Sequence, residues 1–176
     1  HADVIVDFSH HAALSGLLAY ATRTGTPIVI CTTGHSEAQL AEMKAAAKTV
    51  PVFFSRNMSL GINLLMALCR KAAATLGADF DVEIIEKHHN RKLDAPSGTA
   101  KMLFEAVKEA RPELTEHCGR AGEGKRQKNE VGISSLRMGN VVGIHEVHIC
   151  TGNQTLTLRH EAGSRAMLAE GAVDAA

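Results

Sequence analysis

The first sixty residues alternate short apolar runs with longer stretches of helical character. Each run is too short for a helix and rich in β-branched residues, which favours strands. The three runs are residues 4–8, 27–31 and 51–55. Between them, residues 11–24 form an Ala- and Leu-rich stretch that ends at Gly25, as helices often do, and Ser36 is a good N-cap for a helix to about Lys48. This order predicts a parallel sheet covered by helices on both faces.

The pattern changes after residue 58. One long helix is expected from about Ser59 to Leu76, with a single apolar stripe for the core. The stripe consists of Leu60, Leu64, Leu65, Leu68 and Ala72. A strand at 82–86 is followed by a polar loop rich in His and Lys, and a helix is expected to start near Ser97. Residues 117–130 are rich in Gly and charge, which is typical of a mobile loop.

Three further strands are expected near residues 131–138, 141–151 and 154–161. No helix separates them, so we expect them to pair antiparallel, with Gly152 and Asn153 in a hairpin turn. The sequence therefore predicts an α/β protein: a partial doubly wound parallel sheet in residues 1–58, joined to an α+β domain with a mixed sheet in residues 59–165. Residues 166–176 are expected to start a helix that returns to the first domain.

The chain enters its first apolar run almost at once, has no initiator methionine, and stops inside a helical pattern. We therefore expect an internal piece of a longer protein. Nineteen basic and nineteen acidic residues balance, so no strong field would attract nucleic acid or an anionic membrane. No apolar run is long enough for a bilayer span, and no secretory signal is seen. Cysteines without a CxxC pair predict reduced thiols and a cytoplasmic location. They are Cys31, Cys69, Cys118 and Cys150.

Residues 86–100 concentrate titratable side chains at the end of an apolar strand. Ser97 is a good N-cap, and the helix start at Ser97–Thr99 would offer backbone N–H groups to an anion. His88, His89 and Lys92 nearby suggest proton transfer beside an anionic substrate. A solvated polar loop before an ordinary capped helix explains the same residues equally well at this level.

The same segment, EKHHNRKLDAPSGT at residues 86–99, resembles the signature E-x-H-H-x-x-K-x-D-A-P-S-G-T of the dihydrodipicolinate reductases at every fixed position. Further segments resemble the family's motifs in the same order. They are VDFS at 6–9, CTTG at 31–34, NMSLGIN at 57–63, RMGNVVGIH at 137–145, and Ser164-Arg165. The resemblance covers essentially the whole chain and implies a Rossmann nucleotide-binding portion in residues 1–58 and a substrate-binding and oligomerisation domain in residues 59–165.

The resemblance also implies residue roles. His88 and Lys92 match the proposed proton-transfer residues. The positions that match substrate-carboxylate binding are His89, Ser97, Gly98, Thr99 and Arg165, and Arg137 becomes a further candidate near the carboxylates. The positions on the side of the cofactor, NADH or NADPH, are Phe8, Ser9, Cys31, Thr32, Thr33, Ser55, Arg56, Asn57 and Met58.

The implied reaction is reduction of 4-hydroxy-tetrahydrodipicolinate to tetrahydrodipicolinate in diaminopimelate and lysine biosynthesis, by a homotetramer acting on a small dicarboxylate. The family's opening glycine-rich phosphate loop is not in this sequence, and Cys31 stands where the family has glycine. Two rivals stay open: another two-domain Rossmann dehydrogenase of amino-acid precursors, and a non-catalytic anion-binding module. A metal site is not expected, because the ten histidines form no chelating pattern with cysteines or carboxylates. No histidine is placed beside Cys31 to make it a nucleophile.

Overall fold

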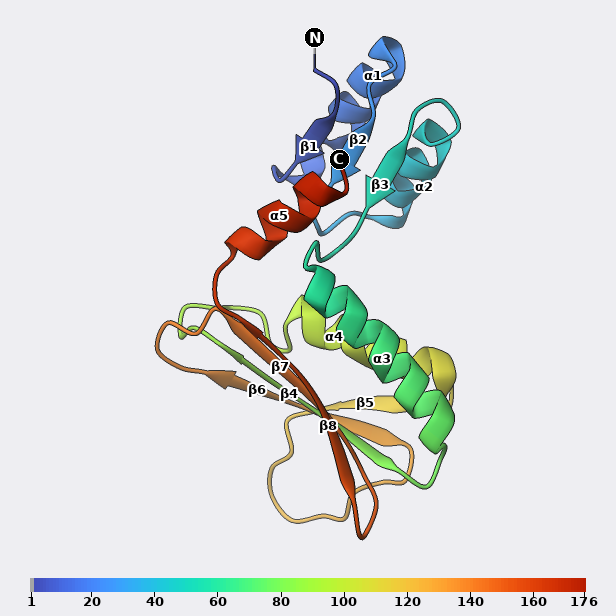
Figure 1. Ribbon diagram of the computed structural model, residues 1–176. Helices are drawn as coiled ribbons and strands as arrows, with labels where there is room; N and C mark the ends of the chain where they lie inside the picture. Colours follow the sequence, from blue (N-terminus) through green and yellow to red (C-terminus); the bar gives the residue numbers. More distant parts are fainter. Residues whose placement is uncertain (1) are drawn as a thin grey trace. The chain divides into compact units, whose positions relative to one another are not determined.

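The computed structural model describes residues 2–176, which form two compact units (Figure 1). Unit 1 contains the residues up to Ser59 together with Ala166–Ala176, and unit 2 contains Leu60–Arg165. The mixture of a parallel sheet and a mixed sheet confirms the predicted α/β fold class. Within residues 2–176, no helix has the length and apolar character that a bilayer crossing requires.

Unit 1 is built on a parallel sheet of three short strands in the order β1-β2-β3. The strands are β1 (Ile5–Asp7), β2 (Ile28–Ile30) and β3 (Val52–Phe54). The helices are a 3-10 turn η1 (His11–Ala13), α1 (Leu14–Thr24), α2 (Glu37–Ala46) and α5 (Ala166–Asp174). Gly25 ends α1 in the left-handed conformation, with a φ of 69°. Ser36 and Gln39 form a complete capping box at the start of α2.

Both faces of this sheet contact helices. Side chains of α1 and α2 pack against Ile28 and Ile30 on one face. On the other face, Ala172 of α5 packs with Val29 and Met58. The two segments approach closely because Gly171 has no side chain: a Cβ there would overlap the Met58 carbonyl oxygen. The last helix of the chain therefore completes the core of the first unit.

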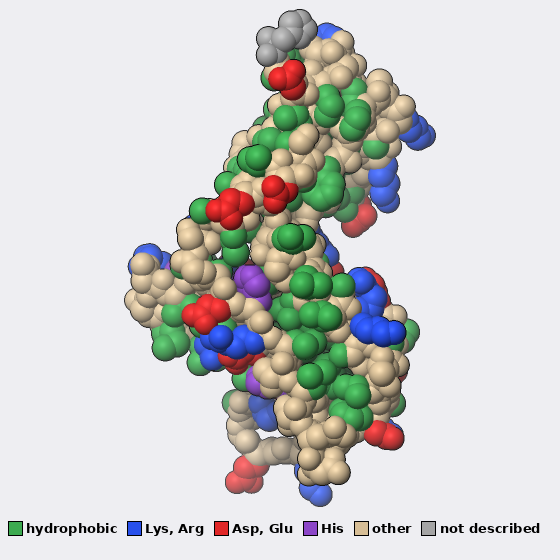
Figure 2. Space-filling model, viewed as in Figure 1, with side chains coloured by type: hydrophobic (Ala, Val, Ile, Leu, Met, Phe, Trp, Pro, Cys, Tyr) green, Lys and Arg blue, Asp and Glu red, His purple; other side chains and the backbone are tan. Residues whose placement is uncertain are grey.

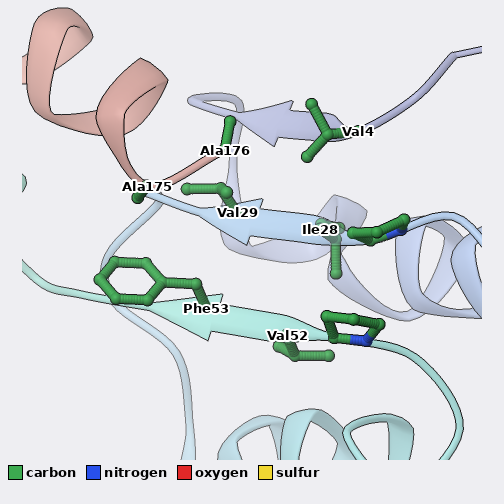
Figure 3. A pocket seen from close by; sticks show the side chains of 9 residues that line it. Val4, Ile28, Val29, Val52, Phe53, Ala175 and Ala176 are labelled. Atoms are coloured by element: carbon green, nitrogen blue, oxygen red, sulfur yellow. The ribbon is translucent and has the colours of Figure 1, made fainter.

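The second face of the sheet also carries an open pocket of about 430 Å³ (Figure 3). Its lining is apolar throughout: Val4, Pro27, Ile28, Val29, Pro51, Val52, Phe53, Ala175 and Ala176. Because no charged or polar side chain faces it, this pocket is suited to apolar contacts and unsuited to an anionic substrate.

Unit 2 is a five-stranded mixed sheet with α3 and α4 packed on one face (Figure 1). Its elements are α3 (Leu60–Leu76), β4 (Asp81–His88), α4 (Gly98–Ala110), β5 (Thr115–Cys118), β6 (Glu130–Arg137), β7 (Gly143–Cys150) and β8 (Thr155–Ala162). The core lies between the helices and β4, β6 and β7. The hairpin of β7 and β8 is confirmed, with Gly152 and Asn153 in the turn.

The predicted pairing of β6 is wrong. The strand order is β5-β6-β4-β7-β8, so β6 pairs parallel with β4 and β5 and does not contact β7 along a ladder. β4 takes the central position because the chain passes through α4 and β5 before β6, so β6 pairs on one side of β4 and β7 on the other. Only β4–β7 and β7–β8 are antiparallel.

The predicted core stripe of α3 is also wrong in part. Leu60, Leu64 and Leu68 are exposed, at 75%, 58% and 45%, and Figure 2 shows hydrophobic side chains gathered along this helix. The buried face instead consists of Ile62, Leu65, Cys69 and Ala73. Both sets repeat at helical spacing, so periodicity alone could not tell which of the two neighbouring stripes faces the sheet.

The segment expected to be a mobile loop, residues 117–130, is more structured than predicted. Its start belongs to β5, and Arg126 ties its end to the sheet. The Arg126 guanidinium donates to Glu83 Oε1 at 3.1 Å, to Asp81 Oδ1 at 2.8 Å and to the Val82 carbonyl at 3.2 Å. Gly132 on β6 leaves the space in which the Glu83 carboxylate lies.

Candidate functional site

A cluster of titratable side chains lies at the carboxyl end of the central strand β4. Side chains alternate along a strand, so Glu86 points to the same face as the core residues Val82 and Ile84. The register places Glu86 between Ser135 on β6 and His145 on β7, and pairs His88 with Arg137. The Glu86 carboxylate therefore follows the core residues Val82 and Ile84 on the same face of β4, next to Ser97 at the start of α4.

Glu86 is fully buried and is the centre of a hydrogen-bond network. Arg137 donates to both carboxylate oxygens, from Nη1 to Oε2 at 2.9 Å and from Nη2 to Oε1 at 2.7 Å. The Ser97 backbone N–H donates to Oε1 at 3.1 Å, and His88 Nδ1 lies 2.5 Å from Oε2. One carboxylate therefore joins β4, β6 and the first residue of the α4 cap.

These partners keep Glu86 ionised. Burial by itself opposes the charge, but the hydrogen bonds from His88 and Arg137 outweigh it and hold the pKa of Glu86 well below its ordinary value. Arg137 has further partners, because Nη2 donates to the Asp94 carbonyl at 2.7 Å. In the structure, Arg137 forms an ion pair with Glu86 inside the protein.

Ser97 caps α4 and links it to the buried His145. Its hydroxyl accepts from the Ala100 N–H at 3.2 Å and lies 3.2 Å from His145 Nε2. The rings of His145 and His88 meet edge to face, with centroids 5.1 Å apart. Burial, with repulsion from His88, lowers the pKa of His145 to about 4, so this imidazole is neutral at pH 7.

A second group of predicted residues lines an open pocket of about 390 Å³. The lining consists of His89, Arg91, Asn140, Val142 and Arg165. Arg165 Nη2 lies 3.2 Å from His89 Nε2, and Arg91 donates to Asn140 Oδ1 at 2.7 Å. Desolvation, together with the nearby Arg91 and Arg165, lowers the pKa of His89. With two guanidinium groups and no carboxylate in its lining, the pocket is suited to an anion.

Lys92 follows on the same loop. Its ammonium group is 2.8 Å from Asp94 Oδ1, and its side chain is 21% exposed. The hydrogen bond from Lys92 lowers the pKa of Asp94. Lys92 therefore has an acidic partner in place, and its positive charge adds to desolvation in lowering the pKa values of His89 and His145.

The predicted residues of unit 2 thus meet around one strand end. His88, Ser97 and Lys92 belong to the buried network and its rim, while His89 and Arg165 line the pocket. Gly98 begins α4, and a Cβ there would meet no atom within 4 Å, so the backbone of the helix start is open to approach. Thr99 is the next residue of α4.

Sequence reasoning missed three members of this site: Glu86, Arg137 as its partner, and His145. Glu86 stands in the motif, yet a single Glu at the end of a strand is more often a solvated residue. The alternation of β4 carried a usable signal, since Glu86 falls in register with Val82 and Ile84. His145 and His148 are three positions apart on β7, so they should point to opposite faces. The structure confirms that they do.

The residues expected on the cofactor side lie in unit 1, at one edge of its sheet. They follow the carboxyl ends of the three parallel strands: Phe8 and Ser9 after β1, Cys31, Thr32 and Thr33 after β2, and Ser55, Arg56, Asn57 and Met58 after β3. Ligands of open parallel sheets bind at this edge. Burial, with the negative charge of Asp7, raises the pKa of Cys31 to about 11, which leaves this thiol protonated and unreactive.

Asp7 is a further polar group at this edge. It is buried, and its Oδ1 accepts from the Ser9 N–H at 2.9 Å and from the Ser9 hydroxyl at 2.5 Å. Burial opposes its charge, but the hydrogen bonds from Ser9 and Thr32 outweigh burial and lower the pKa of Asp7. Its Oδ2 has no hydrogen-bond partner among residues 2–176. The unpartnered Oδ2 leaves one acceptor at this edge for a ligand that carries hydrogen-bond donors.

Two family models match this chain. The model for the N-terminus of dihydrodipicolinate reductase matches residues 1–58, and the model for its C-terminus matches residues 61–176. The chain belongs to the dihydrodipicolinate reductase family. It is therefore part of an NAD(P)H-dependent oxidoreductase of diaminopimelate and lysine biosynthesis, and the fit of the unit 1 edge to a nicotinamide cofactor agrees with this.

Individual relatives agree with the family assignment. The 4-hydroxy-tetrahydrodipicolinate reductases of Clostridium botulinum and Akkermansia muciniphila are each 47% identical to this chain, over 98% and 99% of it. The chain spans 69% and 72% of these two proteins. A solved dipicolinate-bound dihydrodipicolinate reductase from Paenisporosarcina sp. TG-14 superposes with a TM-score of 0.79 at 28% identity, covering 97% of this chain and 66% of that one. A probable dehydrogenase from Thermotoga maritima, 10% identical with a TM-score of 0.57, shares the fold alone.

Proposed function

We propose that unit 2 binds the dicarboxylate 4-hydroxy-tetrahydrodipicolinate and supplies a proton during its reduction to tetrahydrodipicolinate. The observation that carries this proposal is the arrangement at the end of β4. His89 and Arg91 of the pocket stand between His88 and Lys92 in the sequence, and Arg165 joins the pocket from the segment after β8. The dicarboxylate named for the Paenisporosarcina structure supports an anion of this class.

The charges of the site suit this substrate. Two carboxylates need two sets of donors, and we expect these to be the guanidinium groups of the pocket and the backbone at Gly98, where α4 begins. A bound nicotinamide cofactor would supply the hydride, and its binding is proposed for the residues at the carboxyl edge of the unit 1 sheet. Hydride and one proton are consumed, and the 4-hydroxyl leaves as water.

His88 and Lys92 are the proposed proton-transfer residues. Lys92 carries three donors on a flexible stem, and its pairing with Asp94 keeps the ammonium group at the rim of the site. His88 has one ring nitrogen occupied by Glu86, so the other is available to a substrate. The two groups thus differ in mobility: the imidazole is held, and the ammonium group can follow the substrate.

Titration calorimetry with pyridine-2,6-dicarboxylate tests the pocket. Arg165→Gln should weaken binding about 10- to 100-fold, because a hydrogen bond between charged partners contributes roughly 1.5–3 kcal/mol. Arg70→Gln is the matched control, since Arg70 is an exposed arginine of α3 that pairs with Glu109 outside the pocket. Equal binding by wild type and Arg165→Gln would place the carboxylate site elsewhere. Turnover in the protein extended to the length of its relatives separates an enzyme from a non-catalytic binding module.

We also propose that the protein is a cytoplasmic homotetramer whose subunits meet through the five-stranded sheet. The face of this sheet opposite α3 and α4 has no helix of unit 2 over it. It carries Ile85, Leu136 and Ile144 beside an ion-pair row in which Glu146 contacts Lys87 and Arg159. Light scattering at micromolar concentration is the test, and a clean monomer would contradict the proposal.

A further inference from the structure

Glu86 has no direct part in the function proposed above, yet it is the most completely buried charge of the site. It lies in the core row of β4, and each of its oxygens has two donors. A buried ion pair is weak evidence for stability, because desolvation costs as much as the pairing returns. The question is therefore what the network does for the site.

We propose that Glu86 is a positioning residue, which fixes the ring of His88 as the Nδ1–H tautomer and leaves Nε2 as the nitrogen that exchanges a proton with the substrate. This inference rests on the proposed function and deepens it. Glu86 acts only through His88.

The tautomer follows from the contact. An ionised carboxylate has acceptors and no donor, so a ring nitrogen 2.5 Å from Glu86 Oε2 must carry hydrogen. With Nδ1 donating to Glu86, the neutral ring has its lone pair at Nε2, and the protonated ring has its transferable hydrogen there. Either way, proton exchange with a ligand goes through Nε2.

Arg137 makes this arrangement rigid. Its planar guanidinium holds both oxygens of Glu86, and it is itself fixed by the carbonyls of Asp94 and Leu136 at 2.7 and 2.8 Å. A carboxylate held at both oxygens cannot rotate away from His88. The arginine thereby sets the direction of the Glu86 lone pair that receives the Nδ1–H group.

The opposite side of the His88 ring is limited by β7. A Cβ at Gly143 would lie 3.1 Å from His88 Nε2, which is tighter than ordinary carbon–nitrogen contact. Glycine therefore leaves room at the nitrogen that must reach the substrate. The ring is held at Nδ1 by Glu86 and has free space at Nε2 only because Gly143 lacks a side chain.

The charged groups around His88 come from several elements. Arg137 faces it from β6 and Glu86 from its own strand, while His145 approaches from β7 with its ring centroid 5.1 Å away. Lys92 and His89 lie on the following loop and repel further positive charge. Glu86 is thus the one negative side chain in direct contact with the ring among the residues described.

Glu86→Gln tests the inference, with Glu83→Gln as the matched control. Glu83 lies on the same strand and pairs with Arg126, but it does not contact the site. The glutamine amide can still accept from Ser97 and Arg137 through its oxygen, and it then turns its NH₂ group toward His88 Nδ1. Nitrogen-15 NMR of histidine-labelled protein should show His88 as Nδ1–H in the wild type and in Glu83→Gln, and as Nε2–H in Glu86→Gln. The His88 signals are assigned by their loss in His88→Gln.

The second readout is turnover in the protein extended to the length of its relatives. Glu86→Gln should lower kcat by about 10²–10⁴-fold, the usual contribution of a positioned acid or base, while the Kd for pyridine-2,6-dicarboxylate stays unchanged. Gly143→Ala, which leaves the buried ion pair intact, should lower kcat without changing the tautomer. If circular dichroism shows that Glu86→Gln is unfolded, Glu86→Gln/Arg137→Met removes both charges and takes its place.

The outcomes separate the two claims. A His88 tautomer that stays Nδ1–H in Glu86→Gln overturns the positioning role, whatever the activity. If the tautomer switches in Glu86→Gln but the wild-type protein does not reduce the substrate, the positioning role is supported and the proposed function is contradicted. A switched tautomer with undiminished kcat overturns the inference, because the fixed ring would then serve no step of the reaction.

Discussion

Replacing Arg137 by methionine should destabilise this chain strongly. The substitution removes two hydrogen bonds to Glu86 and two to backbone carbonyls, and it leaves a carboxylate that is completely buried without its guanidinium. Removing one member of a buried ion pair costs about 3–5 kcal/mol of unfolding free energy. Urea unfolding followed by circular dichroism measures this loss. Glu86→Gln/Arg137→Met should recover much of it, because no uncompensated charge then stays in the core.

The pH dependence of the same variant tests the electrostatic cause. Hydrogen bonds from His88 and Arg137 overcome the burial penalty and hold the folded-state pKa of Glu86 below its ordinary value of 4.5. In the wild type, the stability from Glu86 is therefore present above pH 4.5 and is lost as the pH falls below it. Without Arg137 the folded-state pKa rises, so the mutant loses less on acidification. The deficit of Arg137→Met should shrink below pH 4.5. A loss under about 1 kcal/mol at pH 7, or one independent of pH, would refute this reasoning.

Three further predictions concern other parts of the chain. The pKa of His145 is about 4 in the folded state and 6.5 in the unfolded state. The free energy of unfolding should therefore fall by about 3 kcal/mol as the pH drops from 6.5 to 4. Urea titrations should show a smaller fall for His145→Gln. Ser36→Ala, which removes a capping box, should cost about 1 kcal/mol of unfolding free energy in the same assay. Lys92→Ala should lower kcat about 10²–10⁴-fold with unchanged cofactor affinity, and a variant that keeps half of the wild-type kcat would contradict its role.

Helix ends could be predicted from the sequence where one residue type determines the local backbone or its hydrogen bonds. Gly25 ends α1 because it takes a left-handed φ, and Ser36 starts α2 because its side chain and that of Gln39 cap each other's backbone. Ser97 likewise caps α4. These features depend on neighbours within four residues, so the sequence contains all the information that decides them.

Choices between distant partners could not be predicted in this way. α3 has two apolar stripes, and only the position of the sheet decides that Leu65 is buried and Leu64 exposed. β6 was expected beside β7, but the chain passes through α4 and β5 first and reaches the other side of β4. Both outcomes depend on contacts between residues far apart in the sequence, which neither periodicity nor propensity describes.

The candidate site shows the same division. The family motif pointed to His88, His89 and Lys92, and the structure places them together at one strand end. It gave Glu86 no role, because its importance comes from Arg137, which lies fifty-one positions later in the sequence.

The order of the two units along the chain has a consequence for folding. Unit 2 is inserted between Ser59 and Ala166 of unit 1, so the packing of Gly171 against Met58 closes a loop of the whole inserted unit. Closing an unstructured loop of that length would cost about 4 kcal/mol in chain entropy. A folded unit 2 removes most of this cost, because its two ends are then fixed by its own core. The packing of α5 onto unit 1 should therefore depend on whether unit 2 is folded. A destabilising core substitution in unit 2 should weaken the packing of α5 against Met58.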